Sequence, residues 1–404
     1  MNIPILDLKG QAKELEEVLM PKIREWFLSG GYIGGEHVKT LEKDFEKYLN
    51  VKHAITVGNG TDALVIALRA CNIKENDEVI TTPFSFFATS EAIASVGAKP
   101  VYVDIKEDTF VIDEEKIEKH ITSKTKAIMP VHIFGHPCNL DKIYEIANKY
   151  NLAVIEDACQ AIGSKYNEKM IGSCTEKVKK SITCFSFFPT KNLGACGDAG
   201  LITTNNDELD IIMRALKEHA GGQMGMQAKS ILEGKDGEEE ITDVDPLYNP
   251  YKYYNYLIGY NSRMDSIQAI ILGEKLKHLD KYNSRRNEIA IFYKNSFKEI
   301  SGLIMPKVED NVYHCFHQFA LKTQYKKELN KFLIDNGVSN AEFYPVPLHL
   351  QKALLYLGYK EGDFPVAEKV CTETICLPVF PDLNQEQLDY IALKVKEFYE
   401  KKGN

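Results

Sequence analysis

Long apolar runs are missing from this sequence, and their absence limits the class of protein. No stretch of the 404 residues approaches about 18 consecutive apolar residues, the length that a membrane-spanning helix requires. Tryptophan occurs only once. The segment Met1–Lys9 has an apolar patch that proline and aspartate interrupt, and it is too short for a signal peptide. We therefore expect neither a membrane span nor a secretory leader.

Paired cysteine motifs are missing as well. The nine cysteines are odd in number, and no CxxC pair occurs among them. Several lie inside apolar runs, where a free thiol behaves as a small hydrophobic group. Free cysteines are typical of reducing compartments. The cysteine pattern favours a cytoplasmic protein, and we expect no metal site.

The sequence also has no basic surplus. Its net charge is −9, and the segment from Glu233 to Asp245 holds seven acidic residues and one lysine, so most of the excess lies there. The remainder of the chain is close to neutral. This distribution argues against nucleic acid or an anionic membrane as the main partner, although a small phosphate pocket remains compatible with it.

Short apolar segments alternate with helical segments along most of the chain. The expected strands are 54–57, 78–82, 100–104, 127–132, 153–157, 182–188 and 201–204, and the expected helices include 11–28, 36–48, 90–96, 114–120 and 140–150. A further helix ends near residue 70. This alternation predicts an α/β fold with a mostly parallel sheet, helices on both faces, and ligands at the carboxyl ends of the strands.

A change of composition divides the chain. Between residues 221 and 260, glycine, glutamine and methionine precede the acidic segment, and six tyrosines follow from Tyr248 to Tyr260. We interpret 221–254 as an exposed insertion, with a lid or a subunit contact as the alternative. A long helix, 266–286, then leads to a smaller α/β unit. We predict a large domain, 1–270, and a small C-terminal domain, 271–404.

One lysine lies at the centre of the candidate site. Lys191 follows the apolar segment 182–188, which Pro189 ends, and a glycine-rich loop connects it to the strand 201–204. Desolvation between two buried strands would lower the pKa of this lysine toward the neutral amine that Schiff-base chemistry requires. From this stretch alone, a solvated hairpin lysine is an equal alternative.

A glycine-rich turn follows the first strand of the series. The residues Gly58-Asn59-Gly60-Thr61-Asp62-Ala63 open a helix, whose first free amides can bind a phosphate. The turn also matches GxGxxA, so an NAD-dependent enzyme is an alternative, as is a capped helix without a ligand. A nicotinamide enzyme would leave the lysine loop unexplained, and the turn lies over fifty residues into the chain.

Together, the lysine loop, the glycine-rich turn and Glu156-Asp157-Ala158-Cys159-Gln160 resemble one protein family. The chain is similar to the pyridoxal-phosphate-dependent aminotransferases of nucleotide-linked sugars, the DegT/DnrJ/EryC1/StrS family. The likeness runs from the first residues to Asp382-Leu383. It implies the aspartate-aminotransferase fold, also called fold type I, with a large cofactor-binding domain and a smaller C-terminal α/β domain.

The resemblance implies four contacts to the cofactor ring. Lys191 would bond covalently to pyridoxal phosphate, and Asp157 would keep the pyridine nitrogen protonated. Gln160 would contact the ring hydroxyl, and Phe86 would stack on the ring face. Taken singly, Asp157 could instead cap a turn and Phe86 could belong to the core.

The resemblance also implies how the cofactor phosphate would be held. Gly60, Thr61 and Ser186 would bind it, together with Asn261 from the neighbouring subunit of a homodimer. Taken singly, Asn261 could equally cap a helix. His132 fits a hydrogen-bonded histidine at a strand end better than a catalytic group.

The reaction that the resemblance implies is transamination. An amino acid, by expectation L-glutamate, would give its amino group to a nucleotide-linked keto-sugar, with Lys191 acting first as general base and then as general acid. Segments 5–8 and 31–34 look more like the branch that aminates carbon 3. The implied role is the biosynthesis of deoxy-amino sugars, including those of cell-surface polysaccharides.

Two alternatives and two departures accompany this resemblance. One branch of the family is a dehydratase that carries histidine in place of the lysine, and a non-catalytic regulatory protein could also keep the fold. Lys191 argues against the first, and the joint presence of Lys191, Asp157 and Phe86 argues against the second. The family usually has glycine at the position of Ala199 and often histidine at that of Phe343, and the latter concerns the substrate side of the pocket.

Overall fold

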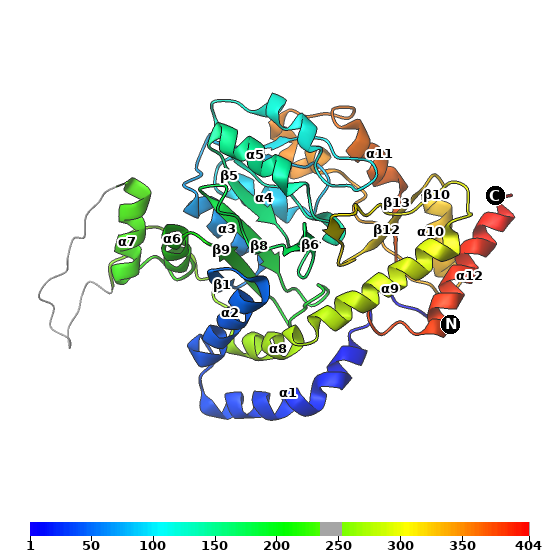
Figure 1. The fold of residues 1–404 in the computed structure, drawn as a ribbon, viewed down its shortest axis with the longest axis horizontal. Helices are drawn as coiled ribbons and strands as arrows, with labels where there is room; N and C mark the ends of the chain where they lie inside the picture. Colours follow the sequence, from blue (N-terminus) through cyan, green and yellow to red (C-terminus); the bar gives the residue numbers. More distant parts are fainter. Residues whose placement is uncertain (235–252, 404) are drawn as a thin grey trace, which may run out of the picture.

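The computed structural model describes residues 1–234 and 253–403, which are built around a seven-stranded sheet (Figure 1). Across the sheet, the strands are β1 (His53–Val57), β9 (Gly200–Thr204), β8 (Ser181–Ser186), β5 (Ala153–Asp157), β4 (Thr125–Ile128), β2 (Glu78–Thr81) and β3 (Lys99–Tyr102). Strand β9 runs antiparallel to β1 and β8, whereas the pairs from β8 to β3 are parallel. The predicted α/β class with a mainly parallel sheet is confirmed.

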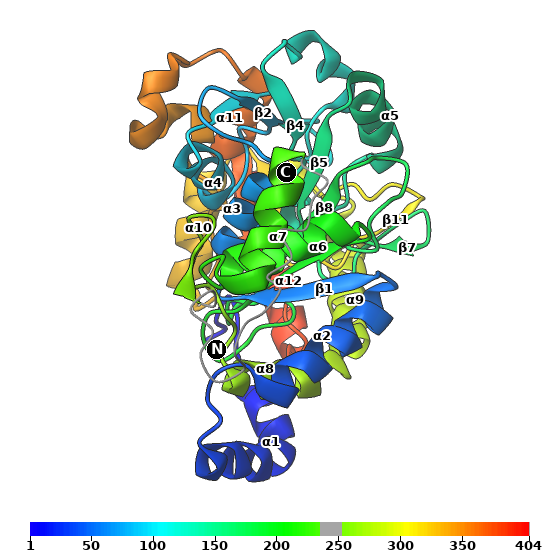
Figure 2. The ribbon, with the colours of Figure 1, turned by 90° about the vertical axis from the view of Figure 1, so that its left-hand side faces the viewer.

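Helices cover both faces of this sheet (Figure 2). On one face lie α3 (Gly60–Ala70), α4 (Ala88–Ser95) and α6 (Asp207–Lys217), and on the other lie α2 (Gly35–Leu49), α5 (Leu140–Tyr150) and α8 (Ser266–Leu276). Neighbouring residues of a strand face opposite layers: Ile155 packs with the α3 side and Val154 with the α5 side. Because both faces are covered, the strands are largely buried and rich in apolar residues.

A second, smaller sheet lies toward the end of the molecule where both termini are found (Figure 1). It contains β10 (Leu303–Ile304), β12 (Phe319–Thr323) and β13 (Thr374–Leu377), and its core includes side chains of α9 (Leu279–Phe297), α10 (Lys326–Asp335) and α12 (Gln385–Lys401). The N-terminal segment joins this unit, because Ile3 is fully buried in the same core.

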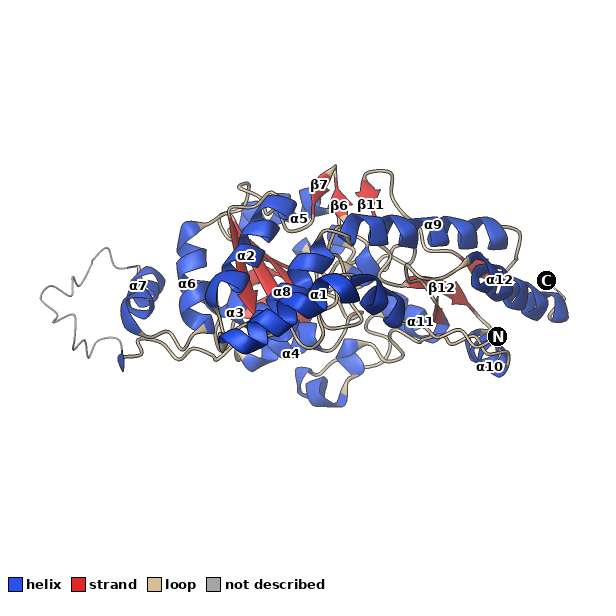
Figure 3. Cartoon of the chain, turned by 90° about the horizontal axis from the view of Figure 1, so that it is seen from below, coloured by secondary structure: helices blue, strands red, loops and turns tan. Residues whose placement is uncertain are grey.

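The remaining elements are short or peripheral. Helix α1 (Lys9–Ser29) lies along α8, as seen from below in Figure 3. A third sheet joins β11 (Val312–Tyr313), β6 (Lys165–Tyr166) and β7 (Lys169–Met170). The other helices are α7 (Gly222–Glu233) and α11 (Pro365–Glu373), with 3-10 turns at η1 (Glu114–Lys116), η2 (Glu118–His120), η3 (Ile133–Gly135), η5 (Leu348–Leu350) and η6 (Lys352–Leu357).

Three expectations differ from the structure. The helix expected at 114–120 is two 3-10 turns, and the single helix expected at 266–286 is α8 followed by α9, with a break at Lys277 and His278. No glycine or proline marks that break. The expected insertion 221–254 begins with α7, which packs against α6 and buries Ala228 in the core, so this part is not an exposed loop. Its remainder, 235–252, lies outside the described residues.

A buried ion cluster joins α2, β1 and α6 beside the sheet. Glu42 accepts hydrogen bonds from the backbone N–H (2.9 Å) and hydroxyl (2.8 Å) of Thr56, and Arg214 donates to its other oxygen at 2.9 Å. Burial opposes ionisation of Glu42, but the charges of Arg214 and Lys217 outweigh it, and the pKa of this carboxyl is lowered. The carboxylate therefore stabilises the fold only while it is ionised.

We predict that Glu42→Gln lowers the free energy of unfolding by about 2 kcal/mol near neutral pH, because a buried cation loses its partner. Since folding lowers the pKa of Glu42, its contribution is present above the ordinary value near 4.5 and is lost as the pH falls through the lower folded value. Urea unfolding of both proteins at pH 7 and at about pH 3 measures this. Glu46→Gln, which removes an exposed pair with Lys43 on the same helix, is the control and should change little. An equal deficit at both pH values would contradict the prediction.

Candidate active site

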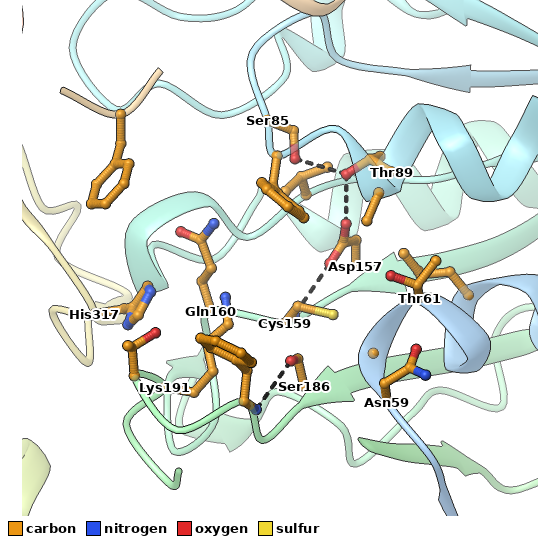
Figure 4. Close-up of a pocket in the computed structure, with 18 of the residues that line it drawn as sticks. Asn59, Thr61, Ser85, Thr89, Asp157, Cys159, Gln160, Ser186, Lys191 and His317 are labelled. Atoms are coloured by element: carbon orange, nitrogen blue, oxygen red, sulfur yellow. Dashed lines mark hydrogen bonds between the residues drawn. The ribbon is translucent and has the colours of Figure 1, made fainter. Parts of the chain in front are cut away.

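A cavity of about 700 Å³ opens at the carboxyl edge of the parallel strands (Figure 4). The turns that follow β1, β2, β5 and β8 all contribute side chains to it, as the alternating pattern predicted. Of the eight site residues predicted from the sequence, seven line this cavity: Gly60, Thr61, Phe86, Asp157, Gln160, Ser186 and Lys191. Asn261 does not.

Lys191 projects into the cavity from the loop between β8 and β9. The loop is compact because two backbone hydrogen bonds close it. The N–H of Lys191 donates to the carbonyl oxygen of Phe188, and the N–H of Ala195 donates to the carbonyl oxygen of Phe187, both at 2.8 Å. A Cβ on Gly194 would meet the carbonyl oxygen of Pro189, so only glycine fits this turn. Burial lowers the pKa of the Lys191 ammonium, and nearby Cys159 and Asp157 only partly oppose this effect.

Asp157 ends β5 and faces the same cavity as Lys191 (Figure 4). Its Oδ2 accepts a hydrogen bond from the Thr89 hydroxyl at 2.7 Å, and its Oδ1 accepts from the backbone N–H of Cys159 at 3.2 Å. Because Thr89 donates its only hydroxyl proton to Asp157, its oxygen must accept from Ser85, 2.7 Å away. This arrangement fixes the direction of the carboxylate.

The N-terminus of α3 forms a cradle for an anion on one side of the cavity. Asn59 caps the helix by accepting from the N–H of Asp62 at 2.8 Å, and the first amides, at Gly60 and Thr61, have no partner within the helix. Ser186 lies opposite. A Cβ on Gly60 would lie 2.6 Å from the Cβ of Ser186, so glycine lets the first turn of α3 approach Ser186 closely and brings its amides beside the Ser186 hydroxyl.

Gln160 and Phe86 border the cavity in different ways. Gln160 is held on both ends of its amide: Oε1 accepts from the N–H of Phe134 at 2.8 Å, and Nε2 donates to the hydroxyl of Tyr344 at 3.0 Å. Phe86 is 58% exposed, and its ring centroid lies 6.2 Å from that of Tyr344. Its exposed face is free to receive a flat ring.

His132 and Asn261 lie elsewhere. His132 is fully buried, with Nδ1 accepting from the N–H of Cys138 and Nε2 facing a carboxylate oxygen of Glu156, both at 3.0 Å. It is a hydrogen-bonded histidine after strand β4, in agreement with the sequence interpretation. Asn261 is exposed and forms a β-bridge with Glu218. In its own chain it does not reach the cavity.

Several residues of the cavity wall were not identified from the sequence. Thr89 orients Asp157, while His317 and Tyr344 come from the segments around β12 and before η5. Phe343, the departure from the family pattern, also lines the cavity. No local motif distinguishes His317 from the neighbouring His314.

These groups together fit pyridoxal phosphate. The open helix amides at Gly60 and Thr61 suit its phosphate, the Asp157 carboxylate suits its ring nitrogen, and the Lys191 amine suits its aldehyde. An α/β fold with this site at the carboxyl ends of its strands defines a pyridoxal-phosphate-dependent aminotransferase.

The chain belongs to the DegT/DnrJ/EryC1/StrS aminotransferase family, whose model matches residues 13–396. It is 43% identical, over 99% of both chains, to a protein of Geobacillus stearothermophilus named pleiotropic regulatory protein. It is 36% identical to the dTDP-3-amino-3,6-dideoxy-alpha-D-galactopyranose transaminase of Aneurinibacillus thermoaerophilus, over 98% of this chain and 99% of that protein.

Solved structures agree with this assignment. The chain is similar to DesV of Streptomyces venezuelae, with a TM-score of 0.87, 32% identity and 99% of each chain covered. It is also similar to NtdA of Bacillus subtilis, determined with the bound cofactor PMP, with a TM-score of 0.83, 30% identity, and 99% of this chain and 85% of that chain covered. The predicted cofactor and fold type are confirmed.

We predict that Gly60→Ala weakens the affinity for pyridoxal phosphate by about tenfold or more, because the added Cβ forces Ser186 away from the helix amides. Fluorescence titration of the cofactor-free protein measures this. Gly273→Ala is the matched control, since a Cβ there meets only Leu41 at 4.0 Å. Unchanged cofactor affinity in Gly60→Ala would show that the phosphate lies elsewhere.

Proposed function

We propose that this aminotransferase moves the amino group of L-glutamate to carbon 3 of a nucleotide-linked keto-sugar. The observation that carries the proposal is the joint placement of Lys191 and Asp157 in one cavity of about 700 Å³, with room for substrate beside the cofactor. The similarity to a transaminase of a 3-amino sugar linked to dTDP supports the substrate class and the position. We further propose that the product serves the biosynthesis of deoxy-amino sugars, including those of cell-surface polysaccharides.

We assign the cofactor contacts as follows. Gly60, Thr61 and Ser186 hold the phosphate, Asp157 pairs with the ring nitrogen, Gln160 lies at the ring hydroxyl, Phe86 covers the ring face and Lys191 forms the covalent bond. When bound, pyridoxal phosphate supplies an electron sink that stabilises a carbanion at the substrate carbon. The Thr89 and Cys159 hydrogen bonds keep the Asp157 carboxylate directed at its partner.

Lys191 moves the proton in both half-reactions. Its lowered pKa favours the neutral amine, which can accept a proton from the carbon of the amino-acid donor. The ammonium that forms returns the proton in the next step, so the side chain acts as base and then as acid. The tight turn at Gly194 keeps the amine at one place while the proton moves.

A homodimer would complete this site. Asn261 is exposed and outside its own cavity, so it is available to the phosphate of a partner subunit. Large apolar side chains are exposed on α1 and in the segment that follows it, including Phe27 (62%), Leu28 (70%) and Ile33 (52%). Apolar surface of this kind is typical of subunit interfaces.

We further propose a cytoplasmic location and two domains. All nine cysteines are free, which suits a reducing compartment. Among the described residues, no helix combines the length and apolar character needed to span a bilayer. The core around the small sheet draws on residues from 289 to 399 and Ile3, which supports a separate C-terminal unit.

Two alternative functions use the same fold. The similarity to a protein named as a regulator makes a non-catalytic role one alternative. The second alternative is the dehydratase branch of the same family. The lysine that the dehydratases lack is present here, and its amine and the Asp157 carboxylate share one cavity. A protein that only bound the cofactor would not need an amine with a lowered pKa.

We predict that Lys191→Ala abolishes the covalent attachment of pyridoxal phosphate and lowers transamination by at least about a thousandfold, because Lys191 supplies the one amine among the described residues that line the cavity. Borohydride reduction followed by mass spectrometry detects the attachment, and circular dichroism confirms the fold. Lys277→Ala is the control, because the side chain of Lys277 is 60% exposed and lies outside the cavity. Full activity in Lys191→Ala would overturn the assignment.

The substrate is decided by a small panel of reactions. With L-glutamate as donor, we predict that 3-keto sugars linked to a nucleoside diphosphate are aminated and that the 4-keto isomers react at least about tenfold more slowly. Product formation is followed by mass spectrometry and the position by NMR. Amination of the 4-keto sugars alone would overturn the carbon 3 assignment, and a dehydrated product would favour the other branch.

A further inference from the structure

A buried chain of hydrogen bonds connects the residue after Lys191 to a histidine in the cavity wall. Asn192 is 3% exposed, and its Nδ2 donates to Oδ1 of Asn283 at 2.8 Å and to the carbonyl oxygen of Cys315 at 3.0 Å. Its Oδ1 lies 3.2 Å from Nδ1 of His317. The chain therefore links the lysine loop to α9 and to the segment before β12.

Two backbone carbonyls fix the direction of every bond in this chain. A carbonyl oxygen can only accept a hydrogen bond. The side-chain atom of Asn283 that lies 3.1 Å from the carbonyl oxygen of Ile162 must therefore be the amide nitrogen Nδ2, and the Oδ1 of Asn283 faces Asn192. In the same way, the carbonyl of Cys315 requires the NH₂ of Asn192. The oxygen of Asn192 is left for His317, where it can only accept.

His317 must therefore carry its proton on Nδ1 and have a lone pair on Nε2. The ring lines the cavity, and no hydrogen bond to Nε2 occurs among the residues that the structure describes. Burial lowers the pKa of His317 well below its ordinary value, and the positive charge of Arg286 lowers it further, so the ring is neutral. His314 has the opposite tautomer, because its Nδ1 accepts from the N–H of Phe316.

The two ends of the cavity differ in the hydrogen-bonding groups that they offer, because the lone pair on Nε2 of His317 lies at one end. In Figure 4, His317 lies on the side opposite Asn59 and Thr61, with Gln160 and Lys191 between them. The helix amides at Thr61 are hydrogen-bond donors and suit an anion. The His317 end instead offers a neutral acceptor, which suits a hydroxyl group and repels a carboxylate.

We propose that Nε2 of His317 accepts a hydrogen bond from a sugar hydroxyl of the second substrate, and that Asn192 is the positioning residue that fixes this tautomer. The proposal rests on the proposed function. The amino-acid donor carries a carboxylate, which can only accept, whereas hydroxyl groups flank the keto group of a sugar. His317 therefore favours the keto-sugar over the amino acid within a cavity that both must use.

Two substitutions at His317 separate the acceptor from the rest of the ring. His317→Asn keeps an amide N–H near the Nδ1 position, toward Asn192, but removes the acceptor, whereas His317→Gln can place a carbonyl oxygen near the Nε2 position. In single-turnover experiments on the holoenzyme, we expect His317→Asn to slow the keto-sugar half-reaction about tenfold or more and the amino-acid half-reaction less than about threefold. His317→Gln should recover much of the loss. Equal losses in both half-reactions, or no recovery, would overturn the proposal.

A substitution at Asn192 tests the positioning role. Asn192→Leu removes the acceptor for Nδ1, so the proton of the neutral ring can move to Nε2, which then donates instead of accepting. We expect this variant to slow the keto-sugar half-reaction about tenfold or more and the amino-acid half-reaction less than about threefold. Adding His317→Gln, whose carbonyl oxygen is an acceptor in every state, should restore much of the keto-sugar rate. No restoration in the double variant would contradict the positioning role.

Neutron diffraction from crystals of the holoenzyme reads the tautomer directly. Deuterium on Nδ1 of His317 supports the proposal, and deuterium on Nε2 overturns it whatever the activity. Failure of the proposed function has a different signature, because the wild-type enzyme would then aminate no keto-sugar while still completing the amino-acid half-reaction. An enzyme that aminates no keto-sugar would also overturn the proposed contact between His317 and a sugar hydroxyl. The tautomer of His317 would still be decided by neutron diffraction.

Discussion

The desolvation of one amine is the constraint on which the rest of the site depends. Burial between two strands disfavours the charged form of Lys191, and the carboxylate of Asp157 only partly restores it. The balance gives an amine that can be neutral where an exposed lysine would be an ammonium. The fold supplies this balance by ending β5 and β8 at the same edge of the sheet, so that both groups enter one cavity.

Buried polar side chains of α8 and α9 form hydrogen bonds with the loop that carries Lys191. Lys275 donates to the carbonyl of Gly194, Gln268 accepts from the N–H of Cys196 at 2.9 Å, and Asn283 accepts from Asn192. All three are at least nine-tenths buried. Such groups are costly unless they are paired, so each fixes the loop in one arrangement.

Local sequence patterns predicted most of the fold and the residues at the centre of the site. The alternation of apolar segments predicted the sheet, and the lysine loop and the turn at Gly60 each have a local signature. Thr89 and Tyr344 could not be predicted, because their roles depend on partners 68 and 184 residues away. The break between α8 and α9 also has no signal, since neither glycine nor proline occurs there and it is tertiary packing that decides the direction of each helix.

The same long-range origin explains why the two ends of the cavity differ in their hydrogen-bonding groups. Donors from the first turn of α3 lie at one end, where the sequence motif is strong, and they suit the cofactor phosphate. The other end is formed by His317 from beyond α9, and its hydrogen-bonding sense is set by carbonyls of Ile162 and Cys315 through two asparagines. A local motif can specify an anion site because a helix N-terminus suffices for it. A neutral acceptor of fixed direction requires a complete chain of partners, and only the folded protein brings them together.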